Sequence, residues 1–477
     1  MSLHTDPTAT VANTPALRQI KNLPGPRAWP LVGNVLQLKP HRIHQDVELL
    51  CQRFGPLLRL YFGRQPVVVV ANHGTVNAIL RERPGTFRRP SLTSQVAAEM
   101  GGLPNVFNAE GANWRNQRRM VMAGFAPKPI KAYFPALVNV ALRLQRRWDV
   151  AAAQHSQIDL SADLKRYTVD IIAGLAFGQD VNTLESGDNV IQQHLDCILP
   201  GIARRSLSIV PYWRYFRLPQ DRKLDQSNTA LRAAVYALIA QARRRMQANP
   251  TLVDKPNNLL EAMIAAADQP GSGVDNDTVA GNVSTMLLAG EDTTANTIAW
   301  LLYLLRRHPE ILQKVALEVK QLAPACAGFT LEQMDALVYL DASIQEAMRL
   351  KPVGPFMPVE AVVDTTIEDV HVPKGTLVWC VLRHDSMDEK YFANPQAFMP
   401  ERWLGASVDK HVSTPFGSGP RTCPGRYLAL LEIKIAVAML LGHFELDNVD
   451  TADGTEAQEL MGFVMSPVGL RMRLKPV

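Results

Sequence analysis

One segment constrains the fold of this 477-residue chain more than any other: Phe416–Gly425, which reads Phe-Gly-Ser-Gly-Pro-Arg-Thr-Cys-Pro-Gly. It places Cys423 between a glycine-rich turn and the start of an apolar helix. Pro424 suits the first position of that helix, because its missing N–H costs nothing there. Partial positive charge at a helix start stabilises a thiolate, and Gly417 and Gly419 let the backbone approach a flat ligand. The segment therefore predicts a deprotonated sulfur beside a planar group.

The same segment resembles the haem-binding loop of the cytochrome P450 family, whose pattern is Phe-x-x-Gly-x-Arg-x-Cys-x-Gly. All five fixed positions are present: Phe416, Gly419, Arg421, Cys423 and Gly425. The resemblance implies that Cys423 is the axial ligand of haem iron. It also implies cofactor contacts from Phe416, Gly417, Arg421 and Gly425. A buried structural cysteine is the alternative interpretation, since free cysteine often behaves as a small core side chain.

A second motif, Ala289-Gly290-Glu291-Asp292-Thr293-Thr294, lies in a long stretch with helical spacing and resembles the oxygen-activation motif of the same family. The small residues Ala289 and Gly290 let a helix approach the haem. The Thr293 hydroxyl could bond to the carbonyl of Ala289 one turn earlier, which would open the helix. Asp292 and Thr293 then form an acid–alcohol pair for proton delivery, with Glu291 at the variable position. A solvated polar helix face is the alternative.

A third motif, Glu346-Ala347-Met348-Arg349, places opposite charges on one face of a helix. A solvated salt bridge is the simplest interpretation, but the flanking residues are mostly apolar and favour a partly buried helix. The resemblance implies that Glu346, Arg349 and Arg402 form a buried structural network that supports the cysteine segment. Buried charges are tolerated only when they are paired and hydrogen-bonded.

Trp114 and Arg118, four residues apart, form the fourth motif. It resembles a Trp-x-x-x-Arg pattern whose side chains contact a haem propionate, and the resemblance implies the same for Arg421. Both side chains of the motif only donate hydrogen bonds, as a carboxylate requires. A surface Trp–Arg stack is the alternative. In many relatives a further basic residue reaches a propionate, but Val359 and Glu360 stand at that place here.

Composition narrows the function classes. The net charge is only +5 and the basic residues are dispersed, which argues against nucleic-acid binding. The five cysteines are widely spaced with no Cys-x-x-Cys pair, so zinc clusters and a disulfide framework are not expected. This usage fits a reducing compartment, and we expect a cytoplasmic protein. The first 20 residues hold no long apolar run, so we expect no transmembrane anchor.

The hydrophobic periodicity predicts a mainly α protein with a smaller β region (α+β), and the resemblance implies the cytochrome P450 fold with a long central helix over the haem. We expect a flexible segment over 1–22 and a single domain over 23–477. Its β-rich part is predicted from about 40–75, 356–382 and 444–477, and its α-rich body from about 76–355 and 383–443. Helices are predicted over 44–54, 135–153, 162–177, 226–246, 274–305, 311–322 and 341–350, and strands over 57–62, 66–71, 358–363 and 376–381.

The motifs together predict a monooxygenase that uses haem b and O2 to oxidise a hydrophobic organic substrate. The chain offers neither an extra glycine-rich βαβ unit nor a cysteine cluster, so we expect electrons from a separate ferredoxin- or flavodoxin-type donor with its reductase. We also expect a monomer. The family's substrate-facing segments imply a pocket lined by Leu288, Gly354, Phe356, Phe463 and Val464.

Three other functions remain open from the sequence. A peroxide-using or rearranging haem-thiolate enzyme usually lacks the acid–alcohol pair that this chain has. A non-enzymatic haem-binding or sensor protein would form no product that depends on reductant and oxygen. A helical scaffold without haem would be colourless. The sequence names neither the substrate nor the position that is oxidised.

Overall fold

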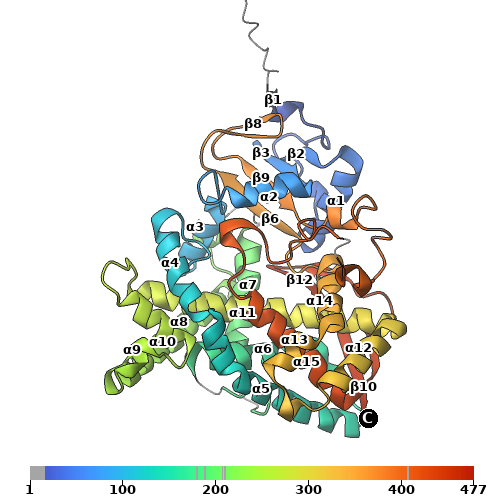
Figure 1. Ribbon diagram of the computed structural model, residues 1–477. Helices are drawn as coiled ribbons and strands as arrows, with labels where there is room; N and C mark the ends of the chain where they lie inside the picture. Colours follow the sequence, from blue (N-terminus) through green and yellow to red (C-terminus); the bar gives the residue numbers. More distant parts are fainter. Residues whose placement is uncertain are drawn as a thin grey trace, which may run out of the picture.

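The computed structural model of the chain describes residues 17–178, 181–186, 190–206, 208, 211–405 and 408–476. Figure 1 shows a β-rich part above a larger helical body. Residues 1–16 of the predicted flexible segment lie outside the described residues. The rest of that segment is held in place, because β1 (Arg18–Gln19) pairs in parallel with β8 (Val370–Val372) and Ile20 is buried. Strand β8 in turn pairs with β7 (Thr365–Ile367).

A five-stranded sheet in the order β2-β3-β9-β6-β4 forms the β-rich part. Its strands are β2 (Leu57–Phe62), β3 (Gln65–Val70), β4 (Phe87–Arg88), β6 (Phe356–Ala361) and β9 (Leu377–Val381). The valines of β3 alternate between two cores. Val67 and Val69 pack with α1 (Ile43–Phe54), while Val68 and Val70 pack with α2 (His73–Arg81). Both faces are covered, which explains why β3 reads as a continuous apolar run.

The helical body is built around α11 (Asn276–Arg307), a 32-residue helix that packs against α6 (Leu160–Phe177) and crosses the body in Figure 1. Asp275 caps α11 by accepting from the amide of Thr278. Two other long helices are α5 (Pro127–Ala153) and α8 (Pro219–Ala248), both of which begin earlier than predicted. Helix α5 continues through Pro135, which the sequence-based prediction took as its start. The remaining α-helices are α3 (Ser91–Glu99), α4 (Gly111–Gly124), α7 (Val190–Ser206), α9 (Thr251–Asp254), α10 (Leu259–Ala267), α12 (Pro309–Leu322), α13 (Leu331–Ala336), α14 (Val338–Leu350) and α15 (Arg426–His443).

The C-terminal strands correct one prediction. Strands β10 (Phe444–Thr451) and β13 (Leu470–Pro476) pair with each other and with β5 (Ile158–Asp159), in a sheet separate from the five-stranded one. Their inward side chains belong to the core of the helical body, and β10 lies at its foot in Figure 1. The assignment of all of 444–477 to the β-rich part was therefore wrong.

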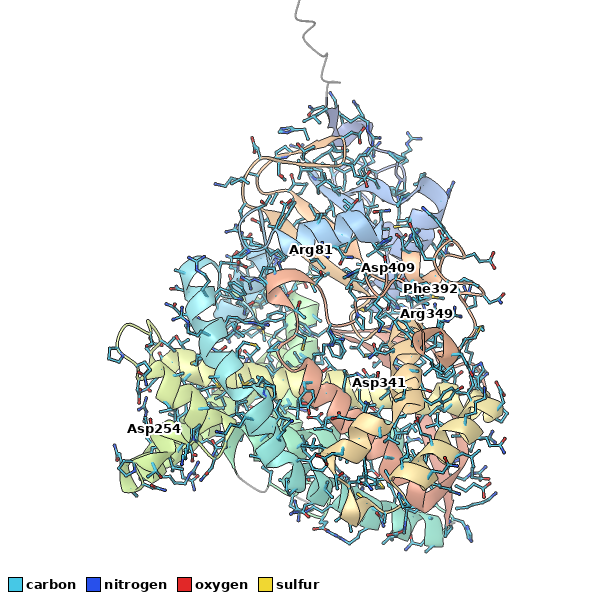
Figure 2. The ribbon with its side chains drawn as sticks, in the orientation of Figure 1. Arg81, Asp254, Asp341, Arg349, Phe392 and Asp409 are labelled. Atoms are coloured by element: carbon cyan, nitrogen blue, oxygen red, sulfur yellow. The ribbon has the colours of Figure 1, made fainter. Side chains whose placement is uncertain are left out.

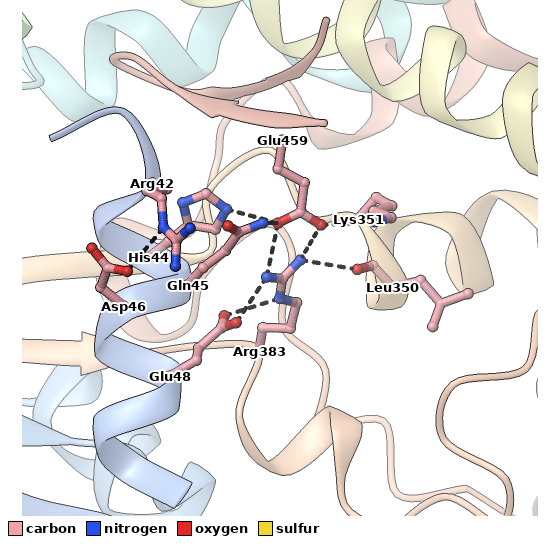
Figure 3. Close-up of polar contacts among 9 residues, drawn as sticks. All are labelled: Arg42, His44, Gln45, Asp46, Glu48, Leu350, Lys351, Arg383 and Glu459. Carbon is pink, nitrogen blue, oxygen red and sulfur yellow. Dashed lines mark hydrogen bonds and ion pairs between the residues drawn. The ribbon is translucent and has the colours of Figure 1, made fainter. Parts of the chain in front are cut away.

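The hairpin of β11 (Glu459–Met461) and β12 (Met465–Pro467) does reach the β-rich part, through the buried network drawn in Figure 3. Glu459 accepts from His44 at 2.7 Å, from Lys351 at 2.8 Å and from Arg383 at 2.8 and 3.0 Å. Arg383 also donates to both oxygens of Glu48. Although burial alone would raise it, these bonds hold the pKa of Glu459 well below its usual range. No helix among the described residues has the length and apolar character needed to cross a membrane.

Candidate active site

The cysteine loop, residues 416–425, is closed by its own backbone and rests on the end of α2. The amide of Cys423 donates to the carbonyl of Phe416 at 3.0 Å. Gly419 has a φ of 74°, and a Cβ there would come within 2.7 Å of the Arg81 backbone. Only glycine fits this position, so the loop is pressed against α2.

The start of the following helix differs from the prediction. Helix α15 begins at Arg426 with Gly425 as its N-cap, so Pro424 lies in the preceding turn and not at the first helical position. The thiol of Cys423 is exposed. Desolvation by the surrounding protein nevertheless raises its pKa, while the Gly425 amide and the Arg118 guanidinium act in the opposite direction. Coordination of a metal ion would displace the proton of this thiol.

The middle of α11 carries the predicted threonine bond. The Thr293 hydroxyl donates to the carbonyl of Ala289 at 2.7 Å, and Ala289 is exposed although most of α11 is buried. An open space therefore adjoins this stretch. Gly290 has a different role from the one expected, because a Cβ there would come within 3.2 Å of the Ile172 side chain on α6. It allows α6 and α11 to pack closely.

Asp292 lies beside a lysine from the neighbouring helix. The ammonium of Lys165 is 2.9 Å from Asp292 Oδ1 and 3.9 Å from Glu291 Oε1. Glu291 is buried, whereas Asp292 is half-buried. Of the two acids, Asp292 is thus the one that is more accessible to solvent.

The predicted propionate residues lie together at the start of α4. The Trp114 ring is buried and lies 4.8 Å from the guanidinium of Arg421. Arg118 donates to the carbonyl of Thr422 in the cysteine loop at 2.6 Å. Arg421 donates to Glu110 at 2.5 Å, so its carboxylate partner is within the chain. Burial lowers the pKa of Arg421 to about 10, and Glu110 opposes that shift.

Sequence reasoning missed two more arginines, Arg83 and Arg89, and the acid Glu110. Burial lowers the pKa of Arg83, and burial together with the charges of Arg83 and Arg421 lowers the pKa of Arg89 further. The sequence did contain one sign of these arginines, an arginine-rich run over 81–89 just before α3, but this run matches no motif. Glu110 stands just before the Trp114 motif and had no pattern of its own.

Comparison with known proteins decides the family. The family model described as Cytochrome P450 matches residues 23–474. The chain belongs to the cytochrome P450 family. The human steroid 17-alpha-hydroxylase/17,20 lyase is 27% identical over 438 residues, covering 88% of this chain and 86% of that enzyme. The putative cytochrome P450 cyp-13B1 of Caenorhabditis elegans is 27% identical over 96% of this chain and 94% of that protein.

A third relative is longer. The self-sufficient cytochrome P450 monooxygenase CYP505AG1 of Oidiodendron maius is 28% identical over 90% of this chain, but the match covers only 40% of that protein. Family membership makes this chain a haem-dependent monooxygenase that uses O2, and it confirms the predicted fold class. It leaves the substrate and the electron donor to be proposed.

The residues present fit a haem. Cys423 is exposed, and a Cβ on Gly425 would touch its sulfur at 3.9 Å, so glycine keeps the space beside the sulfur clear. A Cβ on Gly417 would meet only Met357 Cε, at 3.9 Å, so this part of the loop is open as well. Two buried nitrogens of Arg421, Nε and Nη1, have no hydrogen-bond partner among the described residues. A flat ligand with carboxylates would use both the open space and these donors.

The third sequence motif forms the expected cluster in this P450. Both oxygens of Glu346 accept from Arg349, at 2.7 and 2.8 Å, and Arg402 and Trp403 donate to them at 3.0 and 2.8 Å. Figure 2 shows Arg349 beside Phe392, whose ring centre lies 4.8 Å from the guanidinium carbon. Glu346 and Arg349 are almost fully buried, so the alternative of a solvated salt bridge is wrong.

The predicted substrate residues separate into two groups. Leu288, Val464 and Phe463 are half-buried, with the Phe463 ring 5.8 Å from Phe107, and a Cβ on Gly354 would meet no atom within 4 Å. Phe356 is also half-buried, but its ring centre lies 5.6 Å from that of Trp379, beside the core between the sheet and α1. Its assignment to the substrate pocket stays a prediction.

Proposed function

We propose that this P450 inserts one atom of O2 into a C–H bond of a hydrophobic organic substrate, with haem b held by Cys423. The observation that carries the proposal is the Thr293–Ala289 hydrogen bond of 2.7 Å beside exposed Ala289, in a chain whose loop cysteine is also exposed. A bound haem would supply the activation of O2 and the transfer of one oxygen atom to the substrate, with the other atom leaving as water.

The chain's own residues supply the ligand and the protons. The Cys423 sulfur would hold the iron and supply electron density to it. Asp292 takes up protons from the solvent. The hydroxyl of Thr293, the next residue on α11, holds the proton that is then delivered to the haem site. The Lys165 ammonium, 2.9 Å from Asp292 Oδ1, must move away before that oxygen can accept a proton and pass it on.

Other residues position the cofactor and the loop. Trp114, Arg118 and Arg421 hold the propionates. Phe416, Gly417, Gly425 and Ala289 shape the faces of the haem site. The Glu346–Arg349–Arg402 cluster has a structural role, because its charges are fully used within the protein.

Electrons come from a separate ferredoxin- or flavodoxin-type protein and its reductase. Three exposed arginines, Arg115, Arg119 and Arg426, on α4 and the start of α15, offer a basic surface to an acidic donor. The self-sufficient relative suggests the alternative, a fused donor. Rapid NADPH oxidation and product formation by the purified chain alone would contradict the separate donor.

The substrate is apolar or amphipathic, as the lining by Leu288, Phe463 and Val464 suggests. The human relative is named for a steroid, and we include steroids with terpenoids and fatty acids in a binding screen. Loss of the iron-bound water, seen as a spectral shift, identifies binders. A screen in which only small polar compounds shift the spectrum would contradict the proposal.

Thr293→Ala tests the mechanism. We expect product per reductant oxidised to fall by roughly one to two orders of magnitude, at the low end of what a positioned proton donor contributes. Thr297→Ala is the matched control, because Thr297 makes the same bond, 2.8 Å long, one turn further along α11. Equal losses in both variants, or unchanged coupling in Thr293→Ala, would contradict the proposal and favour a peroxide-using or rearranging enzyme.

A further inference from the structure

The missing basic residue on β6 leaves a question about the second propionate of the haem. Val359 is fully buried, and Glu360 is already engaged by Arg88 at 2.6 Å and by the amide and hydroxyl of Ser91, each at 2.7 Å. Glu360 therefore cannot release Arg88 without leaving a buried carboxylate short of donors. Neither residue on the strand supplies a donor of its own.

Arg83 carries N–H groups that are free to donate to the second propionate. It follows α2 and is only 4% exposed. Its Nη1 contacts the sulfur of Met357 at 3.2 Å, while Nε and Nη2 are buried and have no hydrogen-bond partner in the part of the chain that the structure describes. A buried guanidinium with free N–H groups is costly, so such a group is retained only for a partner of opposite charge.

Arg83 lies close to the position on β6 where a basic residue was expected. Side chains at alternate positions of a strand share a face, so Met357 and Val359 lie on the same face of β6. Both pack in the cluster that contains α2. Met357 also lies against the cysteine loop, 3.9 Å from where a Cβ on Gly417 would be. Arg83 thus contacts the strand on the face where the basic residue was expected, next to the loop that carries Cys423.

The charge balance around the loop points the same way. Four arginines gather there, Arg83, Arg89, Arg118 and Arg421, and Glu110 is the carboxylate beside three of them, Arg83, Arg89 and Arg421. Glu110 already accepts from Arg421 and from the backbone amide of Arg89. About three positive charges remain, enough for the two propionates of a haem.

We propose that Arg83 donates to a haem propionate and replaces the basic residue that β6 lacks. The inference rests on the haem site of the proposed function. It does not depend on the substrate or the electron donor.

The test compares two haems in Arg83→Met and in the native protein. Each protein is loaded with protohaem or with its dimethyl ester, which has no charged carboxylates, and the rate of haem loss to an apoglobin acceptor is measured. We expect Arg83→Met to speed the loss of protohaem roughly tenfold to a hundredfold, the range of a hydrogen bond to a charged group. Loss of the ester should be the same in both proteins.

Arg81→Met and Arg83→Lys complete the design. Arg81 is the exposed last residue of α2, and its replacement should leave both rates unchanged. Arg83→Lys keeps the charge with fewer donors, so it should speed protohaem loss less than Arg83→Met does. If Arg83→Met and Arg83→Lys speed the loss of both haems equally, or of neither, the inference is overturned. Absence of a thiolate-type spectrum in the native protein would instead overturn the proposed function.

Discussion

Two groups of buried charges in this molecule differ in how completely they are satisfied. In the Glu346 cluster and the Glu459 network, carboxylates and guanidinium groups use one another fully. Around the cysteine loop, buried nitrogens of Arg83 and Arg421 have no hydrogen-bond partner on any residue that the structure describes. A saturated cluster needs nothing more and serves the fold. An unsaturated one is complete only with a ligand, and here the ligand that fits is the carboxylate-bearing haem.

The largest effect should come from breaking a saturated cluster. Glu346→Ala leaves Arg349 and Arg402 buried without their carboxylate, and we expect it to lower the free energy of unfolding by about 3–5 kcal/mol. Denaturant titration of the haem-loaded protein measures the change. Glu401→Ala is the control, because Glu401 forms an exposed ion pair with Lys314 that should be worth no more than about 1 kcal/mol. Similar losses in the two variants would remove the distinction between buried and exposed clusters.

Glu432 is a buried carboxyl group whose charge is not balanced by a cation among the described residues, so it tests the same comparison at a single residue. Burial raises the pKa of Glu432 to about 8, against a hydrogen bond from Thr294. The folded state then holds a proton that the unfolded state releases near pH 4.5, so this group's contribution to stability is lost as pH rises from about 5 to 8. Glu432→Gln should remove that loss.

Between pH 5 and pH 8, the free energy of unfolding of Glu432→Gln should rise by about 3 kcal/mol relative to that of the native protein. Unfolding midpoints at both pH values measure it. A native stability that does not fall over this interval, or a variant with the same slope, would show that Glu432 is charged and has a partner.

The smallest effect should come from the half-buried pair at the active site. Lys165→Met removes the ion pair with Asp292, and we expect the free energy of unfolding to change by no more than about 1 kcal/mol. Denaturant titration beside Glu346→Ala provides the comparison. A loss as large as that of Glu346→Ala would place Lys165 among the structural charges and contradict the proton path through Asp292.

The sequence predicted the parts of the site that depend on short spacing. The Thr293–Ala289 bond and the Glu346–Arg349 pair join residues four and three positions apart on a helix, so helical geometry alone fixes them. The strands predicted over 57–62 and 66–71 are β2 and β3, which pair with each other across a short turn. For these contacts, in which both residues lie within one helix or one hairpin, rules based on neighbouring positions in the sequence were sufficient.

The rest depends on contacts between distant segments. Arg83 contacts Met357, which lies 274 residues away in the sequence, and Arg383 contacts Glu48, which lies 335 residues away. No sequence motif links the members of either pair. The strands near the C-terminus were misplaced because their third partner, β5, is only two residues long. Pro424 fitted the rule for a helix start, but the turn that aims the Gly425 amide at the sulfur delays the helix to Arg426.

The reduced carbon monoxide spectrum of Cys423→Ala is the most direct test of the central claim, that Cys423 is the thiolate ligand of haem iron. The native protein should show the red-shifted band typical of thiolate ligation, and Cys423→Ala should lose it entirely. Cys197→Ala, which alters a half-buried cysteine on α7, should leave it unchanged. A thiolate-type band that survives in Cys423→Ala would contradict the account.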